Sequence, residues 1–341
     1  MSRVAVIGAG AWGTALAIVL GRNGAHDVRL WAYEPEVCDS INQRHVNATY
    51  LDGLAIPAAI RASNGLGDVL NGAGMVVSVM PSHHCRRLFR EMSPHLGPEM
   101  LIVSASKGIE NETHLRMSEV IAEVVRERRG FRPRLAAISG PSFAREVARG
   151  DPTAITAASL DQSDAAEVQQ GLSDGAFRVY THDDMAGVEL GGALKNVVAI
   201  AAGICDGLGL GFNSVAALIT RGLTEITRLV VACGGRRDTM AGLAGLGDLV
   251  LTCTGSLSRN RSVGVELGRG RKLPEIIAGM HGMVAEGVLT THAAIGLARA
   301  KGVSMPLTEQ MYSILHDGKE PRAAIRELMA RPSTKEFAGF L

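Results

Sequence analysis

The sequence predicts two domains: an α/β domain with a doubly wound, mostly parallel sheet, and an all-α domain after it. Up to about residue 185, short β-branched runs alternate with helical patterns, as in open parallel sheets. From Gly187 onward only helical patterns remain. The length of 341 residues also favours two domains, which we place at residues 1–186 and 187–341.

The chain opens with a strand, a glycine-rich turn and a helix. Residues 3–8 form a short β-branched run, typical of a buried parallel strand. A G-x-G-x-x-G motif follows at residues 8–13, then a helix-forming run at 14–20 and a second strand at 28–33. This is the context in which the motif binds a dinucleotide, with the pyrophosphate at the helix N-terminus. We therefore expect a Rossmann-like fold.

The choice between NAD and NADP stays open. An acid at the end of the second strand would bind the ribose 2′-hydroxyl and favour NAD, whereas an arginine would accept a 2′-phosphate. Tyr33 stands about 20 residues beyond the last glycine, with Glu34 beside it and Arg29 within the strand. Neither determinant is cleanly placed, so either cofactor could serve.

Further strands and helices continue the first domain. We expect strands at 75–80, 100–105, 135–139, 153–158 and 177–180, and helices at 37–44, 118–129 and 164–172. Lys107 follows one of these strands, and Gly140-Pro141-Ser142 follows another. Both segments are candidate ligand sites, because open α/β sheets bind ligands at the carboxyl ends of their strands. The alternative for Lys107 is a solvated loop residue.

The second domain begins with an apolar helix that carries Lys195 and Asn196. Its helices are expected at 188–203, 214–233, 274–277, 290–301, 306–315 and 321–329, with a short turn near 239–241. A lysine in so apolar a helix is costly unless it is used. Gly191 and Gly192 lie one turn earlier on the same face, so we expect open space there through which substrate reaches the amine. The alternative is that Lys195 extends to the surface and the glycines serve helix packing.

Two further motifs lie in the helical half. Residues 242–249 form a glycine-rich turn that ends in the acid Asp248. Residues 256–261 form a compact polar loop in which Arg259 is flanked by serine and asparagine. Bidentate positive charge with neutral donors beside it suits a phosphate dianion. The alternative is an exposed basic loop.

Composition excludes several classes of partner. The formal net charge of +1 gives no electrostatic case for nucleic acid or a membrane surface. The five cysteines are widely spaced and form no C-x-x-C, which argues against a disulfide framework or a metal site and favours a cytoplasmic protein. No segment beyond the N-terminal strand and helix is uninterrupted enough to suggest a membrane span.

Taken together, the motifs resemble bacterial-type NAD(P)-dependent glycerol-3-phosphate dehydrogenase. The resemblance runs from Val4 to about Leu328 and rests on residues 8–15, 106–108, 138–144, 187–196, 217–223, 242–249, 258–261 and 284–288. Two positions depart from the family pattern. Ala285 stands where valine is usual, which affects packing, and Phe212 stands where a small or polar residue is common, which affects the shape of the cleft.

The resemblance implies reversible hydride transfer between NAD(P)H and dihydroxyacetone phosphate, giving sn-glycerol 3-phosphate for glycerophospholipid synthesis. It implies that Lys195 is the general acid/base, with Lys107 and Asp248 as its partners. Residues implied in substrate binding are Lys107, Gly140, Ser142, Lys195, Asp248, Ser258, Arg259 and Asn260. Residues implied in cofactor binding are Gly8, Gly10, Ala11, Trp12, Gly13, Tyr33, Lys107, Ala144, Arg259, Val284 and Glu286.

Two alternatives remain beside this function. A related dehydrogenase could act on another hydroxy acid or sugar phosphate, although the arginine of the polar loop argues against a substrate without phosphate. A non-catalytic NAD(P)-binding sensor would have no need of Lys107, Lys195 and Asp248 together. The resemblance also implies a homodimer.

Overall fold

The computed structural model describes residues 2–280, 285–333, 335 and 336. The chain divides into two compact units, one of Met1–Ser106 with Met117–Met185 and one of Lys107–Arg116 with Ala186–Leu341. This division differs from the predicted boundary in one respect. Residues 107–116, which the sequence placed in the first domain, belong to the helical unit because Ile109 packs into its core.

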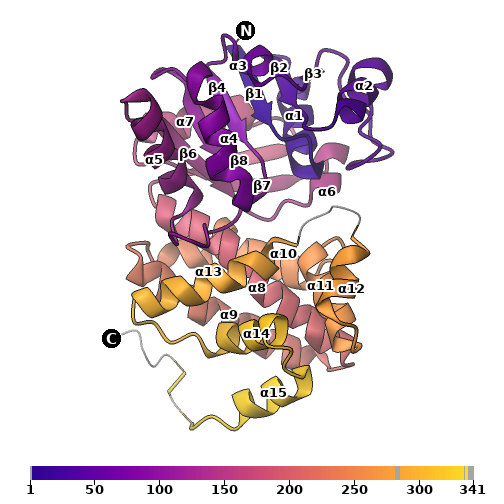
Figure 1. Ribbon diagram of the computed structural model, residues 1–341, viewed down its shortest axis with the longest axis vertical. Coiled ribbons are helices and arrows are strands. Elements are labelled where there is room, and N and C mark those ends of the chain that lie inside the picture. Colours follow the sequence, from indigo (N-terminus) through magenta and orange to yellow (C-terminus); the bar gives the residue numbers. More distant parts are fainter. Residues whose placement is uncertain (1, 281–284, 334, 337–341) are drawn as a thin grey trace. The chain divides into compact units, whose positions relative to one another are not determined.

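An eight-stranded sheet forms the centre of the first unit (Figure 1). The strands are β1 (Ser2–Ile7), β2 (His26–Trp31), β3 (Arg61–Ser63), β4 (Met75–Ser78), β5 (Leu101–Ser104), β6 (Arg134–Ser139), β7 (Thr153–Ala158) and β8 (Phe177–His182). Their order is β3-β2-β1-β4-β5-β6-β7-β8, and β6 and β7 alone pair antiparallel. The prediction of a doubly wound, mostly parallel sheet is confirmed. The three-residue strand β3 was not predicted.

Helices cover the sheet in two groups. They are α1 (Ala11–Asn23), α2 (Pro35–Arg44), α3 (Leu66–Leu70), α4 (Cys85–Met92), α5 (Met117–Arg129), α6 (Ala144–Arg149) and α7 (Gln162–Leu172), with short 3₁₀ helices η1 (Ser82–His84) and η2 (Ser93–His95). Helix α1 packs with α6 and α7, and α4 packs with α3 and α5. Because the strand order reverses between β1 and β4, right-handed crossovers place these groups on opposite faces of the sheet.

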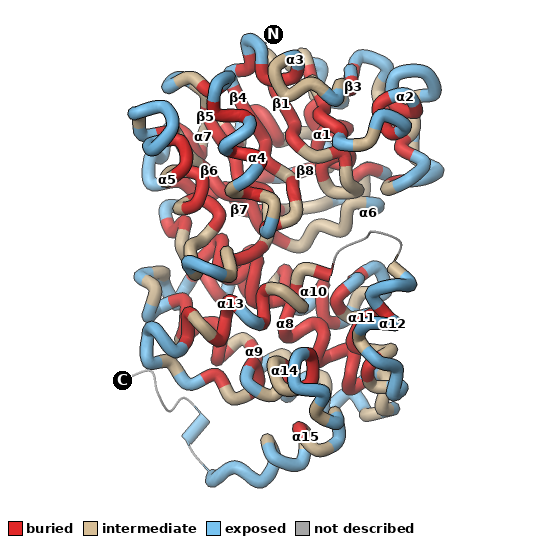
Figure 2. The backbone as a smooth tube through the Cα atoms, viewed as in Figure 1, coloured by how far each residue is buried: buried red, intermediate tan, exposed pale blue. Residues whose placement is uncertain are grey.

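The core of this unit explains why the strands form. Residues 4–7 of β1 are fully buried, and β4 and β5 are buried along their whole length, as Figure 2 shows in red. Strands that are buried on both faces read as continuous apolar runs of valine, isoleucine and leucine. The short β-branched runs of the sequence are such strands.

The second unit is helical. Its elements are α8 (Met185–Gly207), α9 (Phe212–Ala232), η3 (Asp238–Ala241), the π-helical turn η4 (Leu243–Gly247), α10 (Asp248–Thr254), α11 (Arg259–Gly268), α12 (Leu273–Ala278), α13 (Glu286–Ala300), α14 (Pro306–His316) and α15 (Pro321–Met329). Among its described residues, β-structure is limited to one bridge between Ile109 and Arg116. The prediction of an all-α second domain is confirmed, although α10 and α11 were read from the sequence as a turn and a loop.

Helix α8 lies at the centre of this unit. Its length and composition would allow it to cross a membrane, but 94% of its apolar 18-residue stretch is buried inside the protein. Burial of that kind is typical of the core helix of a globular domain. Lys195 therefore sits on the most enclosed helix of the unit.

Candidate active site

Lys195 lies near the middle of α8, and its side chain is only 7% exposed. Its ammonium group donates to one carboxylate oxygen of Asp248 and to the hydroxyl of Thr252, which is 2.7 Å away. The alternative in which this lysine extends to the surface is therefore wrong. The lysine points into the unit and is held there by an acid and a hydroxyl.

Lys107 binds the other oxygen of the same carboxylate. The distance from Lys107 Nζ to Asp248 Oδ2 is 2.8 Å. The structure thus brings together Lys107, Lys195 and Asp248, the three residues that the sequence singled out for acid/base chemistry. We call them, with Thr252, the lysine–aspartate cluster.

A second ion pair anchors the segment that carries Lys107. Arg116 Nη1 lies 2.7 Å from Glu189 Oε2, on the first half of α8, and the bridge from Ile109 to Arg116 closes the segment into a loop. One end of this loop is therefore fixed to α8, the helix that carries Lys195, and the other end is fixed to Asp248 at the start of α10. Sequence reasoning missed this pair. The available signal was Glu189, a charged residue in the same apolar stretch as Lys195.

Asp248 is placed by an unusual turn. It is the first residue of α10, its side chain is 1% exposed, and the π-helical turn Leu243–Gly247 runs directly into it. A Cβ atom on Gly245 would lie 2.3 Å from the Met240 carbonyl oxygen, so the turn requires glycine there. π-helical turns are rare and often occur at functional sites.

The expected open space beside Lys195 is not found at Gly191. A Cβ atom there would lie 2.8 Å from the carbonyl oxygen of Ala244 and 2.9 Å from Met240 Cε. Gly191 instead lets α8 pack closely against the π-helical turn. The prediction of a substrate gap at this glycine was wrong, because close backbone packing brings Lys195 within hydrogen-bonding distance of Asp248.

Burial and charge set the protonation of the cluster. Burial is the main cause that lowers the pKa of Lys195 to about 8, and the positive charge of Lys107 acts in the same direction, whereas Asp248 opposes both. Burial also acts to raise the pKa of Asp248, but the two ammonium groups outweigh it and keep that pKa below its ordinary value. The cluster therefore holds an ionised acid beside a lysine that can exchange its proton near neutral pH.

The predicted polar loop is the start of a helix. Ser258 is the N-cap of α11, and its hydroxyl accepts the backbone N–H of Arg261 at 3.2 Å. Arg259 is exposed and makes no hydrogen bond or ion pair with the described residues. A guanidinium group in the first turn of a helix, where backbone N–H groups also point outward, is suited to an anion.

Asn260 links this helix to the lysine–aspartate cluster. Its amide nitrogen donates to Asn196 Oδ1 at 3.0 Å, and its Oδ1 accepts the backbone N–H of Gly287 at 2.9 Å. Asn196 directly follows Lys195 on α8. Both ends of the Asn260 amide are thus engaged within the protein, which gives this residue a positioning role.

The glycine turn in the first unit fits a dinucleotide. Gly8 has φ of +120°, and a Cβ on Gly13 would lie 1.8 Å from the Gly8 carbonyl oxygen, so both positions require glycine. A Cβ on Gly10 would meet open space, and α1 begins behind it without a side-chain cap. The indole N–H of Trp12 is buried and has no hydrogen-bond partner among the described residues. The first backbone N–H groups of α1 lack intrahelical partners and lie beside the open space at Gly10, which suits a pyrophosphate.

The remaining predicted residues are divided between the units. Gly140, with φ of +148°, accepts a hydrogen bond from the Ser142 hydroxyl at 2.8 Å, and Ala144 begins α6. These three residues belong to the first unit, whereas Glu286 begins α13 in the helical unit and acts electrostatically on Arg259. Val284 lies outside the described residues.

The two departures from the family pattern have different settings. Ala285 is 4% exposed and packs in the core of the helical unit, so a smaller residue than valine affects packing there. Phe212 is the first residue of α9 and its side chain is 94% exposed. Among the described residues, no group of histidine, cysteine, aspartate and glutamate side chains could hold a metal ion.

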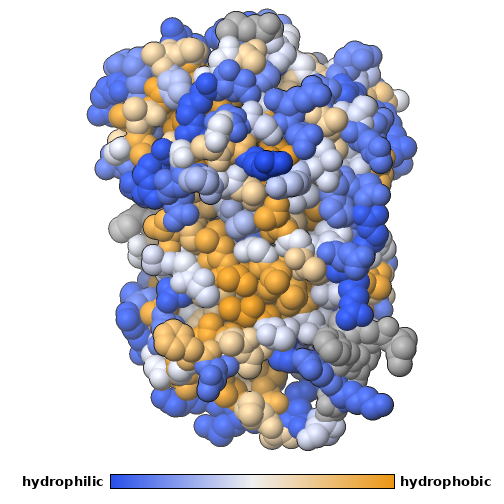
Figure 3. All heavy atoms as spheres, turned by 180° about the vertical axis from the view of Figure 1, so that it is seen from behind, coloured by the Kyte–Doolittle hydropathy of each residue, from blue (hydrophilic) through white to orange (hydrophobic). Residues whose placement is uncertain are grey.

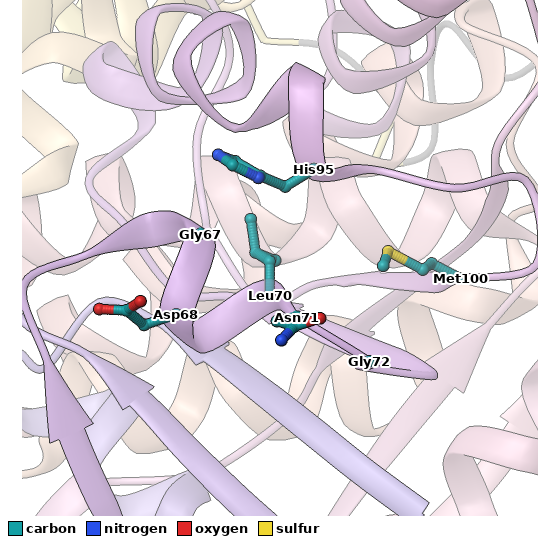
Figure 4. Close-up of a pocket in the computed structure, with 7 residues that line it drawn as sticks. All are labelled: Gly67, Asp68, Leu70, Asn71, Gly72, His95 and Met100. Carbon is teal, nitrogen blue, oxygen red and sulfur yellow. The ribbon is translucent and has the colours of Figure 1, made fainter.

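A surface hollow of about 370 Å³ lies apart from these residues (Figure 4). Its lining comes from α3, from η2 and from the residues just before β4 and β5, and consists of Gly67, Asp68, Leu70, Asn71, Gly72, His95 and Met100. These positions lie at the amino ends of the strands, whereas open α/β sheets bind ligands at the carboxyl ends. The hollow is therefore not the candidate site.

Comparisons with known proteins agree along the whole chain. Residues 3–165 match the family described as NAD-dependent glycerol-3-phosphate dehydrogenase N-terminus, and residues 184–326 match the corresponding C-terminus. Similar curated proteins are glycerol-3-phosphate dehydrogenases (NAD(P)+) from Koribacter versatilis and Acidobacterium capsulatum. The first is 70% identical over 98% of this chain and 99% of its own length, and the second is 54% identical over 98% and 100%.

A solved structure gives the same result. The crystal structure of glycerol-3-phosphate dehydrogenase from Coxiella burnetii is 43% identical, with a TM-score of 0.91 over 97% of this chain and 99% of that one. The glycine turn, the lysine–aspartate cluster and these matches along the length of the chain lead to one assignment. The protein belongs to the NAD-dependent glycerol-3-phosphate dehydrogenase family.

Proposed function

We propose that the protein catalyses the reversible reduction of dihydroxyacetone phosphate to sn-glycerol 3-phosphate with NAD(P)H, which supplies glycerophospholipid synthesis. Membership of the family makes the chain an NAD(P)-dependent oxidoreductase. The observation that carries the proposal is the pair of lysines on one buried carboxylate, Asp248. Because a non-catalytic sensor would not need a buried lysine with a lowered pKa, the cluster favours an enzyme.

Lys195 supplies the proton in this reaction. The bound cofactor supplies a hydride to the ketone carbon, and the carbonyl oxygen then gains negative charge. The Lys195 ammonium gives its proton to that oxygen, and the neutral amine regains a proton from solvent. Asp248 orients the amine, and the positive charge of Lys107 stabilises the developing alkoxide. In the reverse direction the neutral amine takes the hydroxyl proton.

The substrate phosphate is assigned to the start of α11. Arg259 and the N-terminal N–H groups behind Ser258 offer positive charge and donors to a dianion. Asn260 holds this turn against Asn196, next to Lys195. Gly140 and Ser142 are proposed to complete the substrate site. The cofactor is assigned to the predicted set around the glycine turn, namely Gly8, Gly10, Ala11, Trp12, Gly13, Tyr33, Lys107, Ala144, Arg259, Val284 and Glu286.

An assay of NADH and NADPH oxidation with purified protein tests the proposal. We expect turnover with dihydroxyacetone phosphate and at least a ~100-fold lower kcat/KM with unphosphorylated dihydroxyacetone, because the phosphate supplies binding energy that positions the ketone. Lys195→Ala should lower kcat by about 1,000-fold or more, since general acid catalysis contributes on this scale. Cofactor binding, followed by fluorescence, should stay unchanged.

The control is Lys301→Ala, which removes an exposed lysine at the end of α13. This variant should retain full activity. A kcat within a few-fold of wild type for Lys195→Ala would show that another group transfers the proton. Equal activity on both ketones would reject the phosphorylated substrate.

Assembly and location are part of the same proposal. We infer that the protein forms a homodimer and is located in the cytoplasm, as we expected from the sequence. All five cysteines are free thiols, which agrees with a reducing compartment. Apolar side chains reach the surface of the helical unit, visible as orange atoms in the lower half of Figure 3, and its exposed large residues include Phe212, Val231, Leu246, Val250, Leu257 and Ile277. A second copy of the chain would remove such groups from water.

A further inference from the structure

The end of β2 decides which nicotinamide cofactor the first unit can accept. The backbone N–H of Gly8 donates to the carbonyl of Trp31 at 3.1 Å, so the glycine turn lies directly beside this end of the strand. Two side chains were candidates for contact with the adenosine ribose, the arginine within the strand and the glutamate after it. The structure separates them.

The Arg29 side chain is bound near the amino ends of the strands, away from the glycine turn. Its Cα is paired with Ala5, in the middle of β1, and its Nε lies 3.0 Å from Asp27 Oδ1. Asp27 also binds Arg3 Nε at 2.8 Å. This arginine is therefore held toward the amino ends of the strands, whereas ligands of such sheets bind at the carboxyl ends.

Glu34 lies after the carboxyl end of β2 and is held by Tyr50. It is the N-cap residue of α2, but its side chain does not cap that helix. Its Oε1 instead accepts the Tyr50 hydroxyl at 2.7 Å. Burial, together with the charge and hydrogen bond of Glu34, raises the pKa of Tyr50 to about 12. The phenol therefore keeps its proton and donates it in the hydrogen bond to the Glu34 carboxylate.

A buried asparagine ties this pair to the glycine turn. Asn47 is fully buried, and its Nδ2 donates to the carbonyl of Ala9 at 2.8 Å and to Thr14 Oγ1 at 2.8 Å. Its Oδ1 accepts the backbone N–H of Tyr50 at 3.1 Å. A continuous chain of hydrogen bonds thus runs from the dinucleotide turn through Asn47 and Tyr50 to Glu34. The carboxylate has a fixed position relative to the turn.

We propose that this protein prefers NAD(H) to NADP(H), and that the Glu34 carboxylate, positioned by Tyr50, makes the selection. A carboxylate at the end of β2 accepts hydrogen bonds from the ribose hydroxyls and repels a 2′-phosphate. Beyond β2, Arg44 donates to Ser40 and Arg61 donates to the Ala58 carbonyl, so both have partners of their own. The exposed ring of Tyr33 offers an apolar face to the adenine.

The inference rests on the proposed function only in requiring that the site binds a nicotinamide dinucleotide. Its test is therefore a binding measurement, by calorimetric titration of the purified full-length protein with NADH, NADPH, ADP-ribose and 2′-phospho-ADP-ribose. The last two ligands cannot undergo hydride transfer. If none of the four ligands binds, the proposed function fails. If ligands with and without the 2′-phosphate bind equally well, only the present inference fails.

Wild-type protein should bind each ligand without the 2′-phosphate at least about tenfold more tightly than its phosphorylated counterpart, since one charged contact of this kind is worth at least that factor. Glu34→Gln should reduce the ratio severalfold, mainly by tighter binding of the phosphorylated ligand. Tyr50→Phe should reduce it by a smaller factor, because the carboxylate remains but loses its anchor. Arg29→Gln is the matched control and should leave the ratio unchanged.

Thermal unfolding of each variant shows whether the fold is retained, and ADP-ribose binding shows whether the turn is intact. Equal or tighter wild-type binding of the phosphorylated ligands would overturn the proposal. An unchanged ratio of the two affinities in Glu34→Gln would also overturn it. So would loss of binding of the phosphorylated ligands in Arg29→Gln, because that result would show that Arg29 contacts the 2′-phosphate.

Discussion

Asp248 binds two ammonium groups with one carboxylate, so the lysine–aspartate cluster carries one excess positive charge when all three groups are ionised. Burial makes that excess costly and is the main reason why the pKa of Lys195 falls to about 8. The same arrangement makes Lys195 a proton donor that can be used near neutral pH. Without the carboxylate, the two lysines would repel each other with no opposing charge.

Asp248→Asn tests this balance. We expect kcat to fall by about 100-fold or more, because the general acid loses its orientation and its protonated form. The loss of the attraction from Asp248 should lower the pKa of Lys195 further below about 8, so the alkaline limb of the kcat profile for ketone reduction should move to lower pH. Stability should fall by about 3–5 kcal/mol, as when one partner is removed from a buried ion pair.

Thr252→Val is the control for this change. It removes the hydroxyl that Lys195 donates to and leaves the carboxylate in place. We expect a decrease in kcat of about tenfold or less and a loss of about 1–3 kcal/mol from the unsatisfied donor. If both variants had the same pH profile, the charge of Asp248 would not be what sets the pKa of Lys195.

The residues of this cluster could be predicted from the sequence for different reasons. Lys195 stands out because a lysine in an apolar helix demands an explanation, and Lys107 because it follows a parallel strand. The pair of Arg116 and Glu189 could not be predicted, since it joins residues 73 positions apart and no motif contains both of them. Gly191 was misread because a glycine beside a functional residue marks either open space or close packing, and the sequence does not distinguish the two.

At the scale of elements, α8 and α11 are in close backbone contact. A Cβ atom on Gly203 would lie 2.0 Å from the Arg261 carbonyl oxygen, and one on Gly264 would lie 2.0 Å from the Ile200 carbonyl oxygen. Gly207 and Gly268 repeat this contact one turn further on. Two glycines four residues apart on each helix thus let the backbones touch. This contact fixes the Arg259 turn relative to the helix that carries Lys195.

Gly264→Ala should therefore disturb both stability and catalysis. The added methyl group cannot fit without a backbone shift, so we expect a loss of about 3 kcal/mol or more in unfolding free energy. A displaced α11 should also lower kcat/KM for the phosphorylated ketone by about 100-fold, since small misplacements have large effects on reaction geometry. Chemical denaturation and steady-state kinetics measure the two effects.

Gly279→Ala is the matched control in the same unit. A Cβ atom there would have only ordinary van der Waals contacts, the nearest at 3.5 Å. Its stability should stay within about 1 kcal/mol of wild type. If Gly264→Ala were as stable as this control, the two helices would not be in contact through their backbones.

Element boundaries show where the sequence was insufficient. Strands β1 and β7 and helices α14 and α15 were placed to within a residue or two, because apolar periodicity and flanking prolines mark them. Helix α11 was read as a loop because its first turn is Arg-Asn-Arg, with no apolar residue to give a period. Its helical state depends on the glycine contact with α8, which a linear pattern does not contain.

At the scale of the whole molecule, two buried groups give stability opposite dependences on pH. Glu225 on α9 accepts the backbone N–H groups of Leu307 at 2.7 Å and Thr308 at 3.2 Å, and so caps α14. Burial is the main cause that raises its pKa to about 7, from an ordinary value of 4.5. Burial is also the main cause that lowers the pKa of Lys195 to about 8, from an ordinary value of 10.5.

The signs follow from where each state binds the proton. Between pH 4.5 and about 7, folded Glu225 is protonated while the unfolded chain is not, so the unfolding free energy decreases as pH rises. Between about pH 8 and 10.5, the unfolded chain keeps the Lys195 proton and the folded protein does not, so the unfolding free energy increases. Each slope is at most about 1.4 kcal/mol per pH unit, or roughly 3 kcal/mol over its window.

Two variants separate these contributions, and each serves as the control for the other. In Glu225→Gln the amide does not titrate, so the decrease in unfolding free energy between pH 4.5 and about 7 should disappear. The increase in unfolding free energy above about pH 8 should remain. In Lys195→Met the increase in unfolding free energy above about pH 8 should disappear, and the decrease at lower pH should remain. Urea denaturation across the full pH range measures both, as the difference between variant and wild type at each pH. A flat difference curve for Glu225→Gln would mean that Glu225 has the same pKa in the folded and unfolded states, with the α14 N–H groups offsetting the effect of its burial. A flat curve for Lys195→Met would mean that Asp248 keeps the lysine charged through the working range, so that proton transfer from Lys195 would need the substrate to lower its pKa.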